Sequence, residues 1–323
     1  MNFIDRLNCP VCSSTGRELY RLSLSKPPLS EYFRDFYPPQ TIELFRGLEE
    51  DFVLARCESE RCGCWYQQRV PPELFLRRFY SCLAPAKGTP ESVDPYLQEQ
   101  RFRELMMVAR FLQPRVPIPA VLDFGTGDGS WPKLAWAAGC NASACDLVDA
   151  QADDLRRLGV AFYLPEELRP EAFDFINTEQ VFEHLTNPAA LLTNLVRSLR
   201  PGGVLKIGVP FDPDLERKLS HPDWRAAKST PDSLNSVAPI EHLNAYTPWG
   251  LRELGIQAGL GPLHVDGWTL RIGRHPPNRG RLHSGIKRYL LSRLHADYRP
   301  PYRLAQTGFF HKPLSGVKTA QIR

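Results

Sequence analysis

The middle of the chain alternates between short, mostly apolar runs and longer amphipathic runs. Residues 120–122 and 173–176 have the length and composition of buried strands. Residues 131–139 and 189–199 have the spacing of helices, and the first of these ends at Gly139. The pattern therefore predicts strands followed by helices, with a glycine-rich turn between the first strand and the first helix.

That turn, residues 123–129 with the sequence DFGTGDG, is the most informative stretch in the chain. A strand, a glycine-rich turn and a helix together place backbone N–H groups and a helix N-terminus around a polar ligand. Glycine suits the turn because a side chain would block the close approach of backbone to ligand, and because such turns often need positive φ. The motif therefore predicts a ligand site at the end of the first strand.

Carboxylates near the turn narrow the identity of the ligand. Dinucleotide sites have the glycine spacing G-x-G-x-x-G after an uncharged strand end. Here the spacing is G-x-G-x-G, and Asp123 and Asp128 flank the glycines. Carboxylates disfavour a pyrophosphate and suit a ligand with an ammonium group. Asp146 ends a second short strand, residues 141–146, where an acid can hold both ribose hydroxyls. These residues indicate S-adenosylmethionine (SAM) rather than NAD.

Three motifs follow one another between residues 120 and 210. They are the strand and glycine turn at 121–129, the Phe-Asp-x-Ile run that leads to Glu183 and His184, and Leu-Arg-Pro-Gly-Gly at 199–203. In this order and spacing the chain resembles the class I SAM-dependent methyltransferases. The resemblance implies an α/β fold with a Rossmann-like seven-stranded sheet, and transfer of the sulfonium methyl group to a nucleophile. Much of the acceleration in such a reaction comes from holding two reactants in line.

The resemblance also implies roles by motif position. Asp123 is expected to anchor the methionine end of SAM, and Asp146 its ribose. The backbone of residues 125–127 is expected to approach the cofactor, while residues 177–180 lie near the methionine. The expected cofactor-binding residues are Asp123, Gly125, Thr126, Gly127, Asp146, Asn177 and Gln180.

Two Glu-His pairs offer a general base. His184 follows Glu183, and His242 follows Glu241 at the end of a long Pro-, Asp- and Ser-rich segment. A histidine near neutral pH can accept a proton from a hydroxyl or a carbon acid. We expect His242 to contact or deprotonate the acceptor, with Tyr246 assisting, and name His184 as a further catalytic candidate that can instead be structural.

Five of the eight cysteines lie in two clusters near the N-terminus. Cys9 and Cys12 form a C-x-x-C knuckle, and Cys57, Cys62 and Cys64 form an irregular second group. Such clusters in a cytosolic protein favour metal over disulfides. Four thiolates that converge on one ion make a structural zinc site. We expect Cys9, Cys12, Cys57 and Cys62 as ligands, although Cys64 can replace one of the second pair.

Composition shifts along the chain predict its organisation. Residues 211–246 are rich in Pro, Asp and Ser and too long for a plain connection, so we expect a substrate lid there. Residues 263–268 and 307–312 resemble the sixth strand and the antiparallel seventh. The predicted parts are a zinc-ribbon-like module at 1–72, a helical linker at 73–115, a methyltransferase domain at 116–313 with a basic insertion at 270–303, and a tail at 314–323.

Charge is uneven along the chain. Residues 264–323 hold 12 Lys and Arg against 2 Asp and Glu, whereas the whole chain has a net charge of only +4. A basic segment favours an acidic partner such as a phosphorylated substrate, a nucleotide-sugar, an anionic lipid surface or RNA, although it can equally be a solvated face. No run reaches the length of a membrane span and the N-terminus lacks an apolar signal region, so we expect a cytoplasmic protein.

A four-cysteine module ahead of a methyltransferase domain resembles, in arrangement, the sugar C-methyltransferases and related bacterial tailoring methyltransferases. That resemblance implies a small acceptor, such as a sugar, a nucleotide-sugar or a glycan or natural-product intermediate. An RNA or protein methyltransferase, in which the zinc module and basic tail hold a macromolecule, is the alternative. The residues leave open whether O, N or C receives the methyl group.

Overall fold

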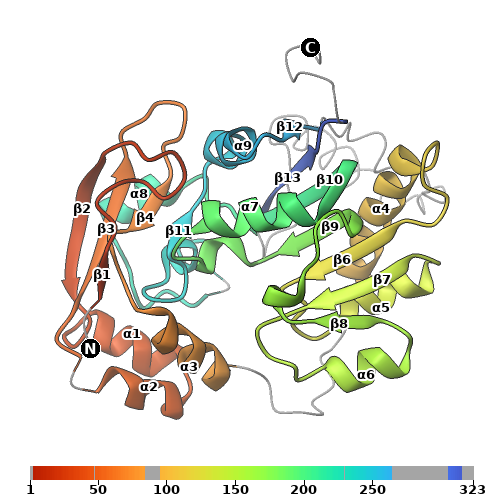
Figure 1. Ribbon diagram of the computed structural model, residues 1–323. Coiled ribbons are helices and arrows are strands. Elements are labelled where there is room, and N and C mark those ends of the chain that lie inside the picture. The colour runs from red at the N-terminus through yellow and green to blue at the C-terminus, as the bar shows by residue number, and fades with distance from the viewer. Residues whose placement is uncertain (1–2, 47, 84–94, 229, 264–304, 315–323) are drawn as a thin grey trace, which may run out of the picture.

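The computed structural model describes residues 3–46, 48–83, 95–228, 230–263 and 305–314 (Figure 1). The helices are α1 Leu29–Phe36, α2 Pro39–Phe45, α3 Glu73–Leu83, α4 Pro95–Leu112, α5 Ser130–Ala137, α6 Ala152–Arg157, α7 Pro188–Ser198, α8 Leu215–Ser220 and α9 Pro248–Gln257, with short 3-10 turns η1 Pro165–Glu167, η2 Phe182–His184 and η3 Asn235–Val237. The strands are β1 Ile4–Asp5, β2 Gly16–Ser23, β3 Asp51–Cys57, β4 Trp65–Gln67, β5 Arg69–Val70, β6 Ala120–Phe124, β7 Asn141–Cys145, β8 Ala161–Tyr163, β9 Phe173–Glu179, β10 Leu199–Pro210, β11 Asn244–Ala245, β12 Gly261–Pro262 and β13 Ala305–His311.

A seven-stranded sheet forms the larger half of the molecule. Its strand order is β12-β13-β10-β9-β6-β7-β8. The five strands from β10 to β8 run parallel, and β13 pairs antiparallel with both β10 and β12. The predicted α/β fold with a mostly parallel seven-stranded sheet is therefore confirmed, including the antiparallel strand expected at 307–312.

Alternate residues along the central strands face opposite sides of this sheet, as the period of a strand requires. Val121, Phe175 and Val204 pack with α4 and α5 on one side. Their chain neighbours Leu122, Ile176 and Leu205 pack with α7 and α9 on the other side. Because helices cover both faces, the strands are apolar on both sides, and their carboxyl ends meet at one edge of the sheet. That edge is where an open parallel sheet holds its ligand.

The N-terminal residues form a second unit with its own core, on the left in Figure 1. Strands β2, β3 and β4 make an antiparallel sheet, and β1 pairs with β5 beside it. Helices α1, α2 and α3 contribute a set of buried aromatic rings to the core, among them the stacked pair Phe33 and Phe45, with ring centroids 4.2 Å apart.

Residues 211–246, which we expect to form a lid, pack into this N-terminal core. Leu215, Trp224 and Ile240 are buried there, and the ring of Trp224 lies 5.5 Å from that of Phe52. Strand β11 completes the N-terminal sheet by pairing with β4. The segment has the irregular backbone that its composition predicts, but its apolar side chains anchor it to the N-terminal unit. It thereby brings residues 241 and 242 to the boundary between the two halves.

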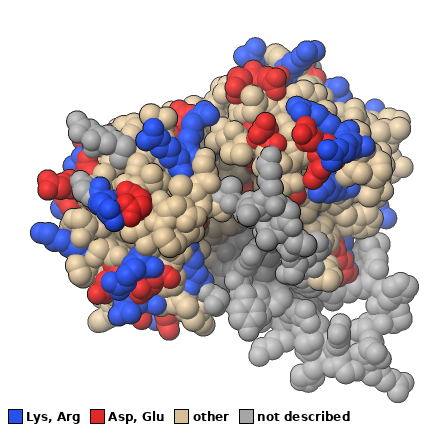
Figure 2. Space-filling model, turned by 90° about the horizontal axis from the view of Figure 1, so that it is seen from below, with Lys and Arg blue, Asp and Glu red and all other residues tan. Residues whose placement is uncertain are grey.

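Several sequence expectations fall outside the described residues. These are most of the proposed sixth strand at 263–268, the basic insertion at 270–303 and nearly all of the tail. On the face seen in Figure 2, Lys and Arg side chains are interspersed with Asp and Glu. Among the described residues, no helix is both long enough and apolar enough to cross a membrane.

Candidate functional site

The glycine-rich turn joins β6 to α5 and has the backbone conformation that its sequence predicts. Gly125, Gly127 and Gly129 have φ values of 78°, 53° and 74°, a region that L side chains rarely adopt. A Cβ at Gly125 would also collide with Cγ2 of Val181, which follows the neighbouring strand β9. Gly125 is therefore needed both for its φ and for close packing against the segment at 181.

Asp123 lies at the end of β6 and is 4% exposed. Its carboxylate accepts hydrogen bonds from Thr126 Oγ1 at 3.0 Å and from Asn177 Nδ2 at 2.6 Å. Burial raises the pKa of Asp123 to about 7, against the opposing effect of these two hydrogen bonds. The structure thus brings together three of the residues predicted to bind the cofactor, around a carboxyl group poised to ionise near neutral pH.

Asp146 follows β7, the strand beside β6 in the sheet. One carboxylate oxygen accepts from the backbone N–H of Gly127 at 3.0 Å, and the other from that of Leu147 at 2.7 Å. The acid predicted to hold the ribose therefore faces the glycine turn. Next to it lies a pocket lined by Leu147, Val148, Asp149, Arg156, Phe162, Leu164 and Glu167.

The two remaining cofactor candidates lie at the end of β9. Asn177 is fully buried, and its Oδ1 has no hydrogen-bond partner among the described residues. Gln180 is exposed and has a φ of 56°, with its N–H bonded to the carbonyl of Gly208. Asn177 thus supports Asp123 from the adjacent strand, while Gln180 lies at the open edge.

A buried ionic network next to this edge was not predicted. Lys206, within the apolar strand β10, is fully buried and its Nζ lies 2.7 Å from Glu179. It also pairs with Glu104 of α4. Arg101 of α4 reaches Glu179 and the hydroxyl of Ser130, at distances of 2.9 and 2.8 Å. The network ties α4 to the sheet and to the start of α5. A lysine in the middle of an apolar strand is the sequence signal that could have predicted it.

The two Glu-His pairs of the sequence meet at the boundary between the two halves. The ring centroids of His184 and His242 are 4.9 Å apart. Nδ1 of His184 bonds to the carbonyl of Glu241 at 2.7 Å, and Nδ1 of His242 bonds to the carbonyl of Asn235. We refer to Glu183, His184 and His242 as the boundary cluster.

Burial sets the charges in the boundary cluster. His242 is 5% exposed, and burial, together with nearby His184, lowers its pKa to about 3. Burial raises the pKa of Glu183 to about 7. Although burial opposes it, Glu241 has its pKa lowered to about 2 by His242, Lys228 and the Tyr37 hydroxyl. The imidazole of His242 is therefore neutral near pH 7 and has a free Nε2.

Side chains from distant segments support the boundary cluster. Tyr80 of α3 donates to the carbonyl of Glu241 at 3.2 Å. Tyr246 is buried and its hydroxyl donates to the carbonyl of Phe182, so it contacts the backbone of η2. Asn244 donates to the same carbonyl and accepts from Arg6 Nη1 at 2.9 Å. No local sequence pattern predicts that Tyr80, Asn244 and Arg6 lie beside the boundary cluster.

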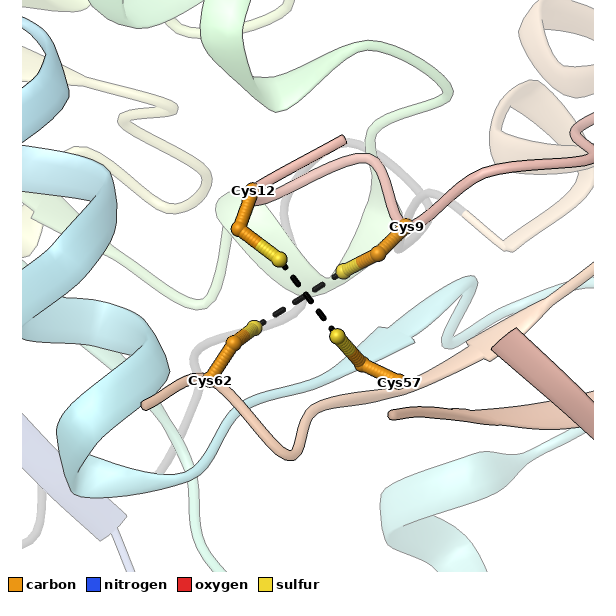
Figure 3. A group of neighbouring side chains, drawn as sticks. All are labelled: Cys9, Cys12, Cys57 and Cys62. Atoms are coloured by element: carbon orange, nitrogen blue, oxygen red, sulfur yellow. Dashed lines mark hydrogen bonds between the residues drawn. The ribbon is translucent and has the colours of Figure 1, made fainter. Parts of the chain in front are cut away.

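The structure brings together the four thiols that we predict as zinc ligands (Figure 3). The sulfurs of Cys9 and Cys62 are 3.7 Å apart, and those of Cys12 and Cys57 are 3.4 Å apart. Cys64 is buried against α9, where a Cβ on Gly250 would collide with its sulfur. The irregular second knuckle therefore contributes Cys57 and Cys62 to the group.

Comparison with known proteins adds a family match. Residues 97–265, just over half of the chain, match the model of a family described as Methyltransferase domain. A curated relative, trans-aconitate 2-methyltransferase of Azoarcus sp. (strain BH72), is 31% identical over 180 residues, which cover 51% of this chain and 60% of the relative. The chain thus spans less than two thirds of that relative's length.

Solved structures of other methyltransferases are similar to this chain at low identity and low TM-score. One is the 1,6-didemethyltoxoflavin-N1-methyltransferase of Burkholderia thailandensis, solved with bound 1,6-didemethyltoxoflavin and S-adenosylhomocysteine. It is 18% identical with a TM-score of 0.45, covering 81% of this chain and 96% of that chain. Another is a SAM-dependent methyltransferase of Mesorhizobium loti, 13% identical with a TM-score of 0.40, covering 64% and 98%.

Proposed function

The chain belongs to the methyltransferase-domain family, and we propose that it transfers a methyl group from SAM to a small polar acceptor. The observation that carries the proposal is the placement of two carboxylates, Asp123 and Asp146, at the ends of adjacent parallel strands beside a glycine turn. This placement suits a ligand with an ammonium group at one end and a ribose nearby.

Each part of the cofactor has a matching group in the chain. Asp123, held by Thr126 and Asn177, would bind the methionine ammonium. Asp146 would exchange its bonds with the turn for the ribose hydroxyls. The half-exposed side chains of Leu147 and Val148 would contact the adenine from the adjoining pocket. When bound, SAM supplies an electrophilic methyl group, and the chain's task is to hold it and the acceptor in line.

We place the acceptor at the boundary cluster. η2, which carries Glu183 and His184, begins directly after Val181, and Val181 packs on the glycine turn. The acceptor end and the cofactor end are therefore joined by one short segment. The imidazole of His242 is neutral, so it can accept a hydrogen bond from the acceptor. Its lowered pKa makes it a weak base, so we propose contact with the acceptor as its first role and proton abstraction as its second. Tyr246 then positions η2, because its hydroxyl donates a hydrogen bond to the Phe182 carbonyl.

A small acceptor suits a cluster enclosed between two packed units. The comparison with a methyltransferase named for trans-aconitate supports a small molecule. The four-cysteine module ahead of the domain favours a sugar, a nucleotide-sugar or a related glycan or natural-product intermediate within that class. The basic residues at 264–323 add a reason to expect an anionic group on the acceptor.

We propose that Cys9, Cys12, Cys57 and Cys62 hold a structural zinc ion. In a tetrahedral site with Zn–S bonds of about 2.3 Å, neighbouring sulfurs are about 3.8 Å apart. The observed separations of 3.7 and 3.4 Å fit that size. Four thiolates complete the coordination of zinc, so the ion would stabilise the N-terminal unit and take no part in the reaction.

One experiment tests the function without prior choice of acceptor. The purified protein is incubated with a metabolite extract and SAM labelled in its methyl group, and the products are separated by size before mass spectrometry. The proposal predicts label in a small polar compound, with no label when Asp123→Ala replaces the wild type. Label confined to RNA or protein would show that the macromolecular alternative is correct, and no label in any fraction would contradict methyl transfer.

A further inference from the structure

The boundary cluster has the donor set of a second metal site, separate from the four thiols. Glu183, His184 and His242 each offer one ligand atom, and these atoms lie within 4.8 Å of one another. Nε2 of His184 is 3.8 Å from the Glu183 carboxylate. Two imidazoles and one carboxylate close together form a set of ligands that binds divalent first-row transition metals.

Both imidazoles are oriented as metal ligands usually are. In each ring, Nδ1 is hydrogen-bonded to a backbone carbonyl oxygen. For His184 this oxygen belongs to Glu241, and for His242 it belongs to Asn235. A carbonyl can only accept, so Nδ1 carries the proton in both rings and each Nε2 keeps its lone pair. A backbone carbonyl bonded to the far ring nitrogen is a common support for a metal-bound histidine, because it fixes the ring and its tautomer.

The carboxylate of Glu183 points to the same conclusion independently. The residue is 1% exposed, and neither of its oxygens has a hydrogen-bond partner among the described residues. The nearby carboxylate of Glu241 is already paired with Lys228 and Tyr37. A buried carboxylate without a partner is costly, and buried charges in proteins are usually paired or coordinate a metal. The buried carboxylate of Glu183 is therefore suited to bind a cation.

We propose that Glu183, His184 and His242 bind one divalent transition-metal ion. Two nitrogen donors favour an ion of the Mn²⁺, Fe²⁺ or Zn²⁺ type over Ca²⁺. Three protein ligands leave coordination positions open, as in catalytic sites. If the acceptor lies here, as the proposed function holds, an oxygen of the acceptor can occupy such a position and become more acidic. His242 then holds the metal, and its role as general base applies to the metal-free protein only.

The experiment uses Mn²⁺ alone as the probe, on the full chain with its thiolate zinc retained. Thiolates select softer ions, so Mn²⁺ reports on the boundary cluster. Free Mn²⁺ is counted by its electron paramagnetic resonance signal during a titration. We expect one Mn²⁺ per chain in the wild type, at least tenfold weaker binding in Glu183→Gln and His184→Ala, and unchanged binding in His221→Ala, which removes an exposed histidine elsewhere.

Zinc content and thermal unfolding, measured on each variant, identify any that fail to fold. His184→Ala should disturb folding less than Glu183→Gln, because the side chain of His184 is 21% exposed and that of Glu183 only 1%. A wild type that does not bind Mn²⁺ at millimolar concentration would overturn the proposal, as would His184→Ala with wild-type affinity. Because SAM binding is measured separately, either result would leave the proposed methyl transfer standing and return His242 to the part of general base.

Discussion

The proposed cofactor end and the proposed acceptor end of this site are built in different ways. At the proposed cofactor end, Asp146 bonds to a glycine 19 residues away in the sequence, and the two residues follow adjacent strands of one sheet. At the proposed acceptor end, Tyr80 bonds to the backbone of Glu241, 161 residues away. One end depends on the local geometry of a sheet, and the other depends on packing between segments that lie far apart in the sequence.

This difference implies that the two ends can be damaged independently. Substitutions at the sheet edge should change SAM affinity, whereas substitutions in the N-terminal unit or the boundary cluster should change turnover.

Loss of the thiolate metal should have the largest effect. Cys57→Ser removes one of four ligands, and the N-terminal unit should lose its zinc and become sensitive to protease. Because Tyr80 belongs to this unit and the segment that carries Glu241 and His242 packs into it, turnover should fall to background. SAM should still bind, because the sheet face that packs with α4 and α5 has a core without these cysteines, although the opposite face shares a core with them. Metal analysis and limited proteolysis measure the loss of zinc and the protease sensitivity, and Cys82→Ser is the matched control. Wild-type protein that contains no zinc after anaerobic preparation would contradict the prediction.

Removal of the imidazole at 242 should come next. A general base typically contributes about 10²–10⁴-fold to a rate, so His242→Ala should lower turnover by that order with little change in SAM affinity. His184→Ala is the informative partner, because the sequence leaves its role open between catalysis and structure. Turnover measured on the true acceptor distinguishes a catalytic role from a structural one. Full activity of His242→Ala would show that His242 is structural.

The contrast between the two ends also explains what the sequence could predict. The glycine turn, Asp123, Asp146 and the four thiols lie in short contiguous motifs whose spacing reflects local backbone geometry. The contacts around the boundary cluster carry no such signal, because Tyr80 and Glu241 come together only through packing. The Pro, Asp and Ser content of residues 211–246 indicates an irregular backbone, which the structure has, and the substrate lid expected there stays a prediction. A few apolar side chains, such as Trp224, determine where that backbone packs.

Asp146→Ala should weaken SAM binding by roughly 10- to 100-fold, the equivalent of one charge-assisted hydrogen bond of about 1.5–3 kcal/mol. The expected loss of affinity is smaller than two new hydrogen bonds to the ribose would give. The reason is that Asp146 already accepts a hydrogen bond from the Gly127 N–H without the cofactor and must exchange it. Equilibrium dialysis with labelled SAM measures it, with Asp154→Ala, which removes an exposed carboxylate of α6 that does not line the adjoining pocket, as the control. An Asp146→Ala protein with wild-type affinity would refute the ribose assignment.

The smallest effect should be a pH dependence of SAM affinity. The pKa of Asp123 is raised to about 7 by burial, so below that pH the carboxyl group is largely protonated and must lose its proton to pair with an ammonium. SAM affinity should therefore fall as pH drops through 7, by at most about tenfold per pH unit. Asp123→Asn should abolish this slope, and a slope that persists in Asp123→Asn would assign the titration to another group.

We infer that this chain holds SAM at the sheet edge independently of the proposed acceptor end. Calorimetric titration of SAM into the wild type, Asp146→Ala and His242→Ala, side by side, tests this inference. We expect one SAM per chain in the wild type, clearly weaker binding in Asp146→Ala and wild-type binding in His242→Ala. No binding to the wild type, or equal weakening in both variants, would contradict it.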